Sequence, residues 1–183
     1  MSERFGAFLR GVNVNGNKIP MKALRKAFQS MGFPDAKTVL NTGNVVFTAD
    51  TEACPRPELK ARIERALDAA FGYKAPVYLR SAGELAASCL AAAGLAAPED
   101  CHVYLLLCDS AGLPAELGAL FAGVPHLPKE GFLPAASDAF WIVQKGATLT
   151  SAFGSKVLGA KKYQSRLTSR NISTVAKMAR MME

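Results

Sequence analysis

The order of predicted strands and helices in the first 80 residues is the feature that most limits how this chain folds. Residues 5–14 are rich in apolar and β-branched side chains and predict a strand, which ends in a polar loop of Asn and Gly. A helix follows, because apolar residues recur every three or four positions between Met21 and Met31, and Gly32 supplies a left-handed stop.

The next segments predict a hairpin, a second helix and a fourth strand. Residues 37–40 and 45–48 are β-prone runs, and the Asn and Gly residues between them suit a tight reversal of the chain. Apolar residues recur every four positions between 57 and 71, which indicates a helix, and residues 75–80 return as a strand.

This order of strand, helix, strand, strand, helix, strand is the ferredoxin-like motif, also called the α/β plait. Pro76 fits the motif, because its last strand lies at a sheet edge, where a missing backbone donor costs least. We therefore expect residues 1–80 to form a ferredoxin-like domain with an antiparallel sheet.

The second half follows the same order more loosely, and we expect a second plait-like domain over residues 81–183. It opens with Ser81 and Glu84, which have the spacing of a helix-capping box. The elements expected after it are a strand from His102, a helix at 113–121, a hairpin at 132–143, a helix at 151–158, an extended segment at 163–167 and a C-terminal helix after Asn171. No repeat of individual residues is evident, so the predicted fold is α+β with two ferredoxin-like halves and a C-terminal helix.

Positive charge is concentrated near the C-terminus. The chain has 22 Lys and Arg and 15 Asp and Glu, and residues 145–183 hold eight of the basic residues and one acidic residue. The first 144 residues are therefore formally neutral, and the whole net charge of +7 is local. Such a block is either a solvated face or a surface that attracts phosphate groups or other anions.

Three stretches of the sequence resemble one known family. They are LRGVNVNGNKIPMKALRKAFQSMGF near the N-terminus, TVLNTGNVVF in the predicted hairpin and LTSRNISTVAKM near the C-terminus. Together they resemble the bacterial family called domain of unknown function 1697, and the resemblance spans nearly the whole chain. It implies a fold of two ferredoxin-like halves and no activity, because the family has none assigned.

Polar loops are expected to gather at one edge of the first sheet. In the ferredoxin-like order the first two strands run parallel, so the loop after strand one and the turn after strand two emerge together. The candidate ligand-binding residues at this edge are Asn13, Asn15, Lys18, Asn41 and Asn44. Beside the start of the first helix they suit an anion or polar base edges, although tight turns need Asn and Gly whatever their function.

Three further residues are candidates. Asn171 suits an N-cap, and Arg170 would then stand beside the free amides of a helix start, where a guanidinium can hold a phosphate or carboxylate. Arg10 lies in a strand whose two faces both carry apolar residues. It either pairs with a carboxylate inside the protein or lines a groove between the halves.

Other classes of site have no support in the sequence. The four cysteines, Cys54, Cys89, Cys101 and Cys108, lack the spacing of metal ligands, so we expect buried free thiols, no metal and no cofactor. No nucleophile elbow or phosphate-binding loop is present, and the sequence leaves open whether the chain is an enzyme. We expect a cytoplasmic protein with no membrane partner, since no apolar run reaches the roughly 20 residues of a membrane span.

Three functions remain open. The preferred hypothesis is a binding module for nucleic acid or a nucleotide-like anion, because the fold is shared with RNA-recognition domains and Phe8 and Phe47 are either stacking residues or core residues. The second is an enzyme or sensor for a small anionic metabolite. The third is a protein-interaction or regulatory module, for which a homo-oligomer is compatible with the sequence but cannot be deduced from it.

Overall fold

Each half of the chain forms an antiparallel sheet in the computed structural model, which describes residues 1–12 and 18–183. The elements of the first half are β1 (Ser2–Leu9), α1 (Met21–Ser30), β2 (Lys37–Val39), β3 (Asn44–Asp50), α2 (Arg56–Phe71), β4 (Val77–Ser81) and α3 (Ala82–Ala93). Those of the second half are β5 (Cys101–Cys108), α4 (Leu113–Ala122), β6 (Gly131–Ala135), β7 (Asp138–Gln144), α5 (Ala152–Leu158), the 3-10 helix η1 (Lys161–Tyr163), β8 (Leu167–Asn171) and α6 (Ile172–Met181).

The two sheets have the same topology. The strand order is β2-β3-β1-β4 in the first and β6-β7-β5-β8 in the second, and neighbouring strands are antiparallel throughout. In each half the last strand leads directly into a helix, α3 or α6. This arrangement confirms the predicted α+β fold of two similar, ferredoxin-like halves.

The chain divides into two compact units. The first contains Met1–Ala87 and Ala176–Glu183, and the second contains Ser88–Val175. From the sequence we placed the boundary between residues 80 and 81 and assigned all of the C-terminal helix to the second domain. In the structure the start of α3 and the end of α6 group with the first unit.

Close packing at Gly6 explains this grouping. A Cβ atom at Gly6 in β1 would lie 3.0 Å from Leu85 Cδ1 of α3 and 3.1 Å from Met178 Cε of α6. Both distances are shorter than ordinary van der Waals contact, so the two helices approach the sheet where β1 has no side chain. The face of the first sheet opposite α1 and α2 is thus partly covered by α3 and α6.

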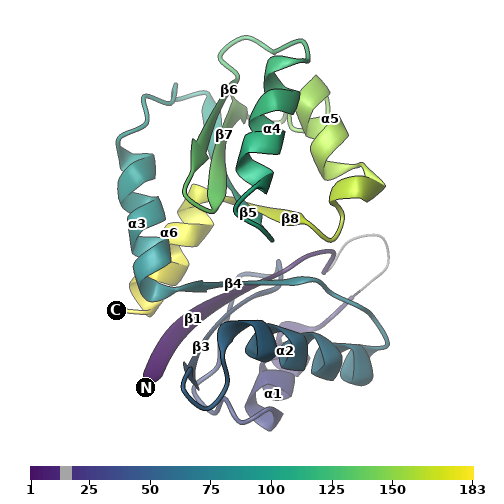
Figure 1. Ribbon diagram of the computed structural model, residues 1–183, viewed down its shortest axis with the longest axis vertical. Coiled ribbons are helices and arrows are strands. Elements are labelled where there is room, and N and C mark those ends of the chain that lie inside the picture. Colours follow the sequence, from purple (N-terminus) through teal and green to yellow (C-terminus); the bar gives the residue numbers. More distant parts are fainter. Residues whose placement is uncertain (13–17) are drawn as a thin grey trace. The chain divides into compact units, whose positions relative to one another are not determined.

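The core of the first unit lies between the sheet and α1 and α2, which cover one of its faces in Figure 1. Phe5 of β1 and Phe47 of β3 are directly paired and point to this face, and the ring centroid of Phe28 in α1 lies 5.3 Å from that of Phe47. Apolar residues at every fourth position of α2 complete the core. Burying each such side chain stabilises the fold by roughly 1.5–3 kcal/mol.

The core of the second unit is organised around its single tryptophan. Trp141 of β7 is buried, and its indole nitrogen Nε1 donates to Glu130 Oε1 over 2.9 Å. The Ser151 hydroxyl donates to the same oxygen over 2.6 Å and accepts from the Gly154 amide over 2.9 Å. Ser151 therefore caps α5 and fixes the carboxylate that satisfies the indole.

Several element ends agree with the sequence. Gly72 follows α2 with a φ of 63°, the left-handed conformation expected of a glycine C-cap. The Ser81 amide donates to Glu84 Oε2 over 2.7 Å, and the Glu84 amide donates to Ser81 Oγ over 3.3 Å, which confirms the capping box at the start of α3.

Two predicted segments were wrong. The first strand ends at Leu9 and not at residue 14, because Gly11 adopts a φ of +75° that interrupts the extended backbone. The segment 163–167 is not the extended piece we expected, because Tyr163 ends the 3-10 helix η1 and the strand β8 follows at Leu167–Asn171.

The edge strand β4 has a side chain bound to its first amide. The Val77 amide donates to Glu64 Oε1 of α2 over 2.9 Å, and Lys60 Nζ lies 2.6 Å from the same oxygen. Pro76, which has no amide hydrogen, precedes the strand. As predicted, the proline stands where the sheet has its edge.

Candidate functional site

The predicted rim of the first sheet brings three distant segments together. The Leu9 amide donates to the Gly43 carbonyl over 2.8 Å, which joins the end of β1 to the turn between β2 and β3. The Arg10 amide donates to the Pro76 carbonyl over 3.0 Å, and the Tyr73 hydroxyl donates to the Arg10 carbonyl over 3.0 Å. The loop after β1 and the turn after β2 therefore lie at the same end of the sheet, as the topology predicted.

The candidate ligands at this rim differ in their surroundings. Asn13 and Asn15 lie outside the described residues. Lys18 and Asn41 are exposed. Arg10 is half-buried, and the loss of solvent lowers the pKa of its guanidinium, an effect that the nearby phenols of Tyr78 and Tyr73 oppose.

The Asn44 side chain forms its hydrogen bonds within the turn between β2 and β3. Its side chain is fully buried, and the amide nitrogen donates to the Val39 carbonyl over 3.0 Å and to the Thr42 hydroxyl over 2.8 Å. These bonds close the turn between β2 and β3. They correspond to the turn chemistry that we considered as the alternative to a ligand site.

Arg170 and Asn171 belong to β8 and not to a loop before the helix. The Arg170 guanidinium donates through Nη1 to the Thr168 hydroxyl and to the Ser169 carbonyl, both over 2.8 Å. Asn171 Oδ1 accepts from the Ser173 amide over 3.0 Å, so Asn171 serves as the N-cap that the sequence predicted.

The basic C-terminal segment does not stay together as one element. Residues 145–175 belong to the second unit, whereas Lys177 and Arg180 lie in the part of α6 that groups with the first. In the second unit Glu116 Oε1 lies 2.6 Å from Lys162 Nζ, and Glu116 Oε2 lies 2.8 Å from Arg166 Nη1. Part of the positive charge is therefore neutralised within the protein.

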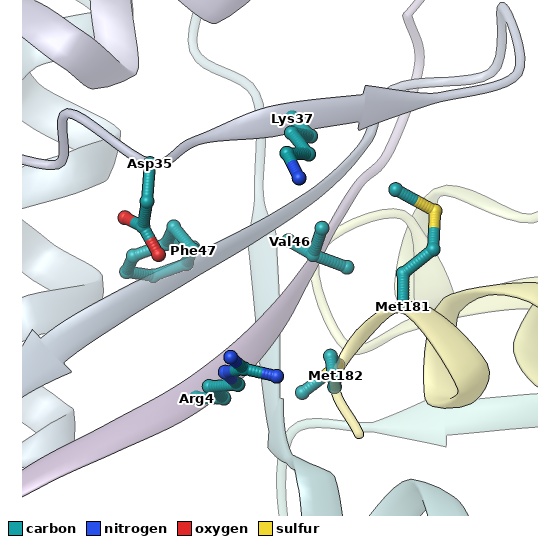
Figure 2. A pocket seen from close by; sticks show the side chains of 7 residues that line it. All are labelled: Arg4, Asp35, Lys37, Val46, Phe47, Met181 and Met182. Atoms are coloured by element: carbon teal, nitrogen blue, oxygen red, sulfur yellow. The ribbon is translucent and has the colours of Figure 1, made fainter.

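The first unit contains a cavity of about 130 Å³ that the sequence did not reveal (Figure 2). Its lining residues come from β1, from the segment before β2, from the start of β2, from β3, and from the end of α6 and the residue after it. They are Arg4, Asp35, Lys37, Val46, Phe47, Met181 and Met182. None of the residues that we predicted as ligands lines it, and this cavity is the candidate site considered below.

The strand register sets the spacing of the charged groups in this cavity. Arg4 of β1 pairs with Thr48 of β3, and Lys37 of β2 pairs with Val46 of β3. Asp35 precedes β2 and is fixed by Thr48, whose hydroxyl donates to Asp35 Oδ2 over 2.6 Å and whose amide donates to Oδ1 over 3.2 Å. The three charged side chains therefore surround the Thr48 and Val46 positions of β3.

The two cations of the cavity stand apart from internal partners. Arg4 and Lys37 are exposed, and within residues 1–12 and 18–183 neither side chain takes part in an ion pair or a side-chain hydrogen bond. Figure 2 shows them on either side of the Val46 side chain. The cavity thus has two positive groups flanking an apolar floor.

The rest of the lining is apolar. Val46, Phe47 and Met182 are each at most 5% exposed, whereas Met181 is 39% exposed at the mouth. The flexible thioethers of Met181 and Met182 can adapt to ligands of different shape. The arrangement can therefore hold a small molecule that has a negative group and an apolar portion.

The aromatic rings, the cysteines and the helices also bear on function. Phe8 and Phe47 are at most 2% exposed and belong to the interior rather than to a stacking surface. All four cysteines are free thiols, of which Cys101 and Cys108 are buried. Among residues 1–12 and 18–183, no three His, Cys, Asp or Glu side chains are placed to share a metal ion, and none of the helices is long and apolar enough to cross a bilayer.

Comparison with known proteins gives a family and a fold. Residues 2–125 match the model of a family described as "Protein of unknown function (DUF1697)". The solved structure of the conserved bacterial protein SP0830 from Streptococcus pneumoniae is similar over 100% of this chain and 99% of that chain, with a TM-score of 0.75 and 20% sequence identity. No curated protein matches the chain.

Proposed function

The chain belongs to the DUF1697 family, whose description assigns no function, and on this premise we propose that it is a binding module for a small organic anion. The ligand lies in the cavity of the first unit, with its negative group between Arg4 and Lys37. Its apolar portion contacts Val46, Met181 and Met182.

The observation that carries this proposal is the pair of cations without internal partners around an apolar floor. Arg4 and Lys37 lie on β1 and β2, the two strands that flank β3, and the strand register places both side chains next to β3. Two like charges on one face repel each other, and an anion between them removes this repulsion and gains charge-assisted hydrogen bonds. A carboxylate or a phosphate would satisfy both side chains.

The size of the cavity favours a small ligand over a nucleotide. A cavity of about 150 Å³ in another protein accommodates benzene, and pockets for drug-sized ligands have volumes of roughly 300–1,000 Å³. The 130 Å³ cavity described here is in the lower class. A short-chain carboxylate fits this volume, whereas a nucleoside with its phosphate does not.

The structure gives less support to nucleic acid as the ligand. Recognition of single-stranded RNA by this fold uses exposed aromatic rings on the central strands. Here Phe8 is fully buried and Phe47 is 2% exposed, so neither ring is available for a base to stack on. The C-terminal basic residues are divided between two units, and two of them pair with Glu116.

The proposal can be tested by calorimetry and thermal shift with short carboxylates and inorganic phosphate. Wild-type protein should gain thermal stability as the ligand concentration rises, because the ligand binds the folded state. The double variant Arg4→Ala/Lys37→Ala should bind at least tenfold more weakly. These side chains are exposed, so the variant should remain folded by circular dichroism.

A matched control separates a specific site from general charge effects. Arg25→Ala/Lys26→Ala removes two exposed cations from α1, and it should bind the ligand like wild type. If no short carboxylate or phosphate binds the wild type, or if the two double variants lose affinity equally, the cavity is not an anion site.

A further inference from the structure

The cavity contains a carboxylate, Asp35, in addition to its two cations. We infer that its ligand carries an ammonium group as well as a negative group, and that the ligand is a small zwitterion of the α-amino-acid type with an apolar side chain. This inference rests on the proposed anion site and specifies the class of molecule that it accepts.

The positions of the charges match such a ligand. Asp35 and Lys37 are two positions apart in the sequence, with only Ala36 between them. The Thr48 hydroxyl binds Asp35 just before β2 begins, and Lys37, the first residue of β2, pairs with Val46. A molecule lying over β3 can therefore direct one end to the carboxylate and its negative group to the cations.

Asp35 is prepared to accept a further donor. The Thr48 hydroxyl and amide each donate one hydrogen bond to its carboxylate, over 2.6 Å and 3.2 Å, and thereby fix its orientation. An ionised carboxylate has about four acceptor sites, so two bonds leave capacity for an ammonium group. The pre-set orientation reduces the entropy lost when the ligand binds.

Electrostatics disfavour a simple anion relative to a zwitterion. Within the described residues, Asp35 forms no ion pair with Arg4 or with Lys37, although all three line the same cavity. An anion bound by the cations would face the uncompensated charge of Asp35 at close range. An ammonium group on the same ligand converts this repulsion into attraction.

The apolar part of the ligand has a separate place. In Figure 2 the Asp35 carboxylate and the Met181 side chain lie on opposite sides of Val46, and Met182 lies below Val46. A ligand with its ammonium group at Asp35 would therefore extend its side chain toward Met181 and Met182. The cavity volume of about 130 Å³ restricts that side chain to a few carbon atoms.

Three ligands that share the same branched four-carbon unit test the inference. L-valine carries both charged groups, 3-methylbutanoate lacks the ammonium group, and isobutylamine lacks the carboxylate. Isothermal titration of the wild type should give at least tenfold tighter binding of valine than of either relative, because each relative leaves one charge of the site unpaired.

Substitution of Asp35 tests whether this carboxylate is responsible for the preference for valine. Asp35→Asn keeps the shape and an acceptor for Thr48 but removes the negative charge. The variant should bind 3-methylbutanoate at least as tightly as wild type and should lose its preference for valine. Glu58→Gln, which removes an exposed charge at the start of α2, is the matched control and should retain the preference.

The possible outcomes separate this inference from the proposed function. If 3-methylbutanoate binds as tightly as valine in the wild type, or if Asp35→Asn retains the preference for valine, the ligand is not recognised as a zwitterion and the anion site alone stands. Tightest binding of isobutylamine overturns the inference as well. If none of the three ligands binds, the inference fails, and the proposed anion site fails with it only if other short carboxylates and inorganic phosphate do not bind either.

Discussion

Arg80 and Arg170 occupy equivalent positions in the two halves of the protein. Each is the fourth residue of the last strand of its sheet, β4 or β8. In both residues the guanidinium donates through Nη1 to the carbonyl oxygen of the preceding residue over 2.8 Å. The two halves therefore share a local side-chain arrangement as well as a topology.

The residue that follows each of these arginines caps the next helix. Ser81 Oγ accepts the Glu84 amide at the start of α3, and Asn171 Oδ1 accepts the Ser173 amide at the start of α6. We expect Ser81→Ala and Asn171→Ala each to lower the free energy of unfolding by about 1 kcal/mol, as measured by urea denaturation. Ser165→Ala, at an exposed position, is the control. Unchanged stability in both cap variants would mean that water replaces the caps at no cost.

Asn44 should be required for stability and not for ligand binding. Asn44→Ala removes two hydrogen bonds inside the turn and leaves the Val39 carbonyl without this donor, so the free energy of unfolding should fall by about 2 kcal/mol. Affinity for a small carboxylate, measured on the folded fraction, should be unchanged. If Asn44→Ala instead has normal stability but no longer binds the carboxylate, Asn44 is a ligand-binding residue.

Gly11 and Tyr73 should show coupled effects. A Cβ atom at Gly11 would lie 2.0 Å from the Tyr73 hydroxyl, and the φ of +75° disfavours any L side chain. Gly11→Ala should therefore destabilise the protein by more than the roughly 1–2 kcal/mol of the left-handed conformation alone. Adding Tyr73→Phe should recover the part due to the collision with the hydroxyl. Strictly additive free energies in this double-mutant cycle would refute the predicted contact.

The ion-pair cluster around Glu116 should make stability depend on pH. Hydrogen bonds from Lys162, Arg166 and Tyr163 lower the pKa of the Glu116 carboxyl from 4.5 to about 2. A folded-state pKa below the unfolded one means that the stabilisation is complete above about pH 4.5 and disappears as the pH falls to about 2.

Glu116→Gln tests this dependence through the melting temperature. At pH 7 the variant should melt roughly 2–4 °C below the wild type, since the cluster is partly exposed and its contribution is modest. The difference should shrink below pH 4.5 and vanish near pH 2. Glu58→Gln, at an exposed position, should show little difference at any pH, and a constant deficit for Glu116→Gln would attribute the effect to packing.

The sequence was sufficient for the fold because its signals are local. Helical periodicity reflects which face of a helix is buried, whereas the glycine after α2 and the Ser81–Glu84 box reflect hydrogen bonds made within a few residues. These elements were confirmed. Strand ends were less well predicted. The residues 5–14 remain apolar beyond the point where Gly11 turns the backbone, so composition alone could not place the end of β1.

The candidate site could not be found from the sequence because it depends on register and on distant segments. Arg4 preceded the predicted first strand, and only its pairing with Thr48 places it near Asp35. Met181 and Met182 join the cavity from the other end of the chain. Asparagine-rich loops attracted attention instead, since turn formation and ligand binding use the same residue types.

The hydrogen bond between Glu64 and the first amide of β4 affects how readily β4 pairs with a strand of another molecule. An exposed strand can recruit a strand of another molecule when its backbone donors are unoccupied. Here the Val77 amide, which points away from β1, is already bound to a helix side chain. The amide at this end of β4 is therefore not available to a strand of another molecule, which disfavours edge-to-edge aggregation.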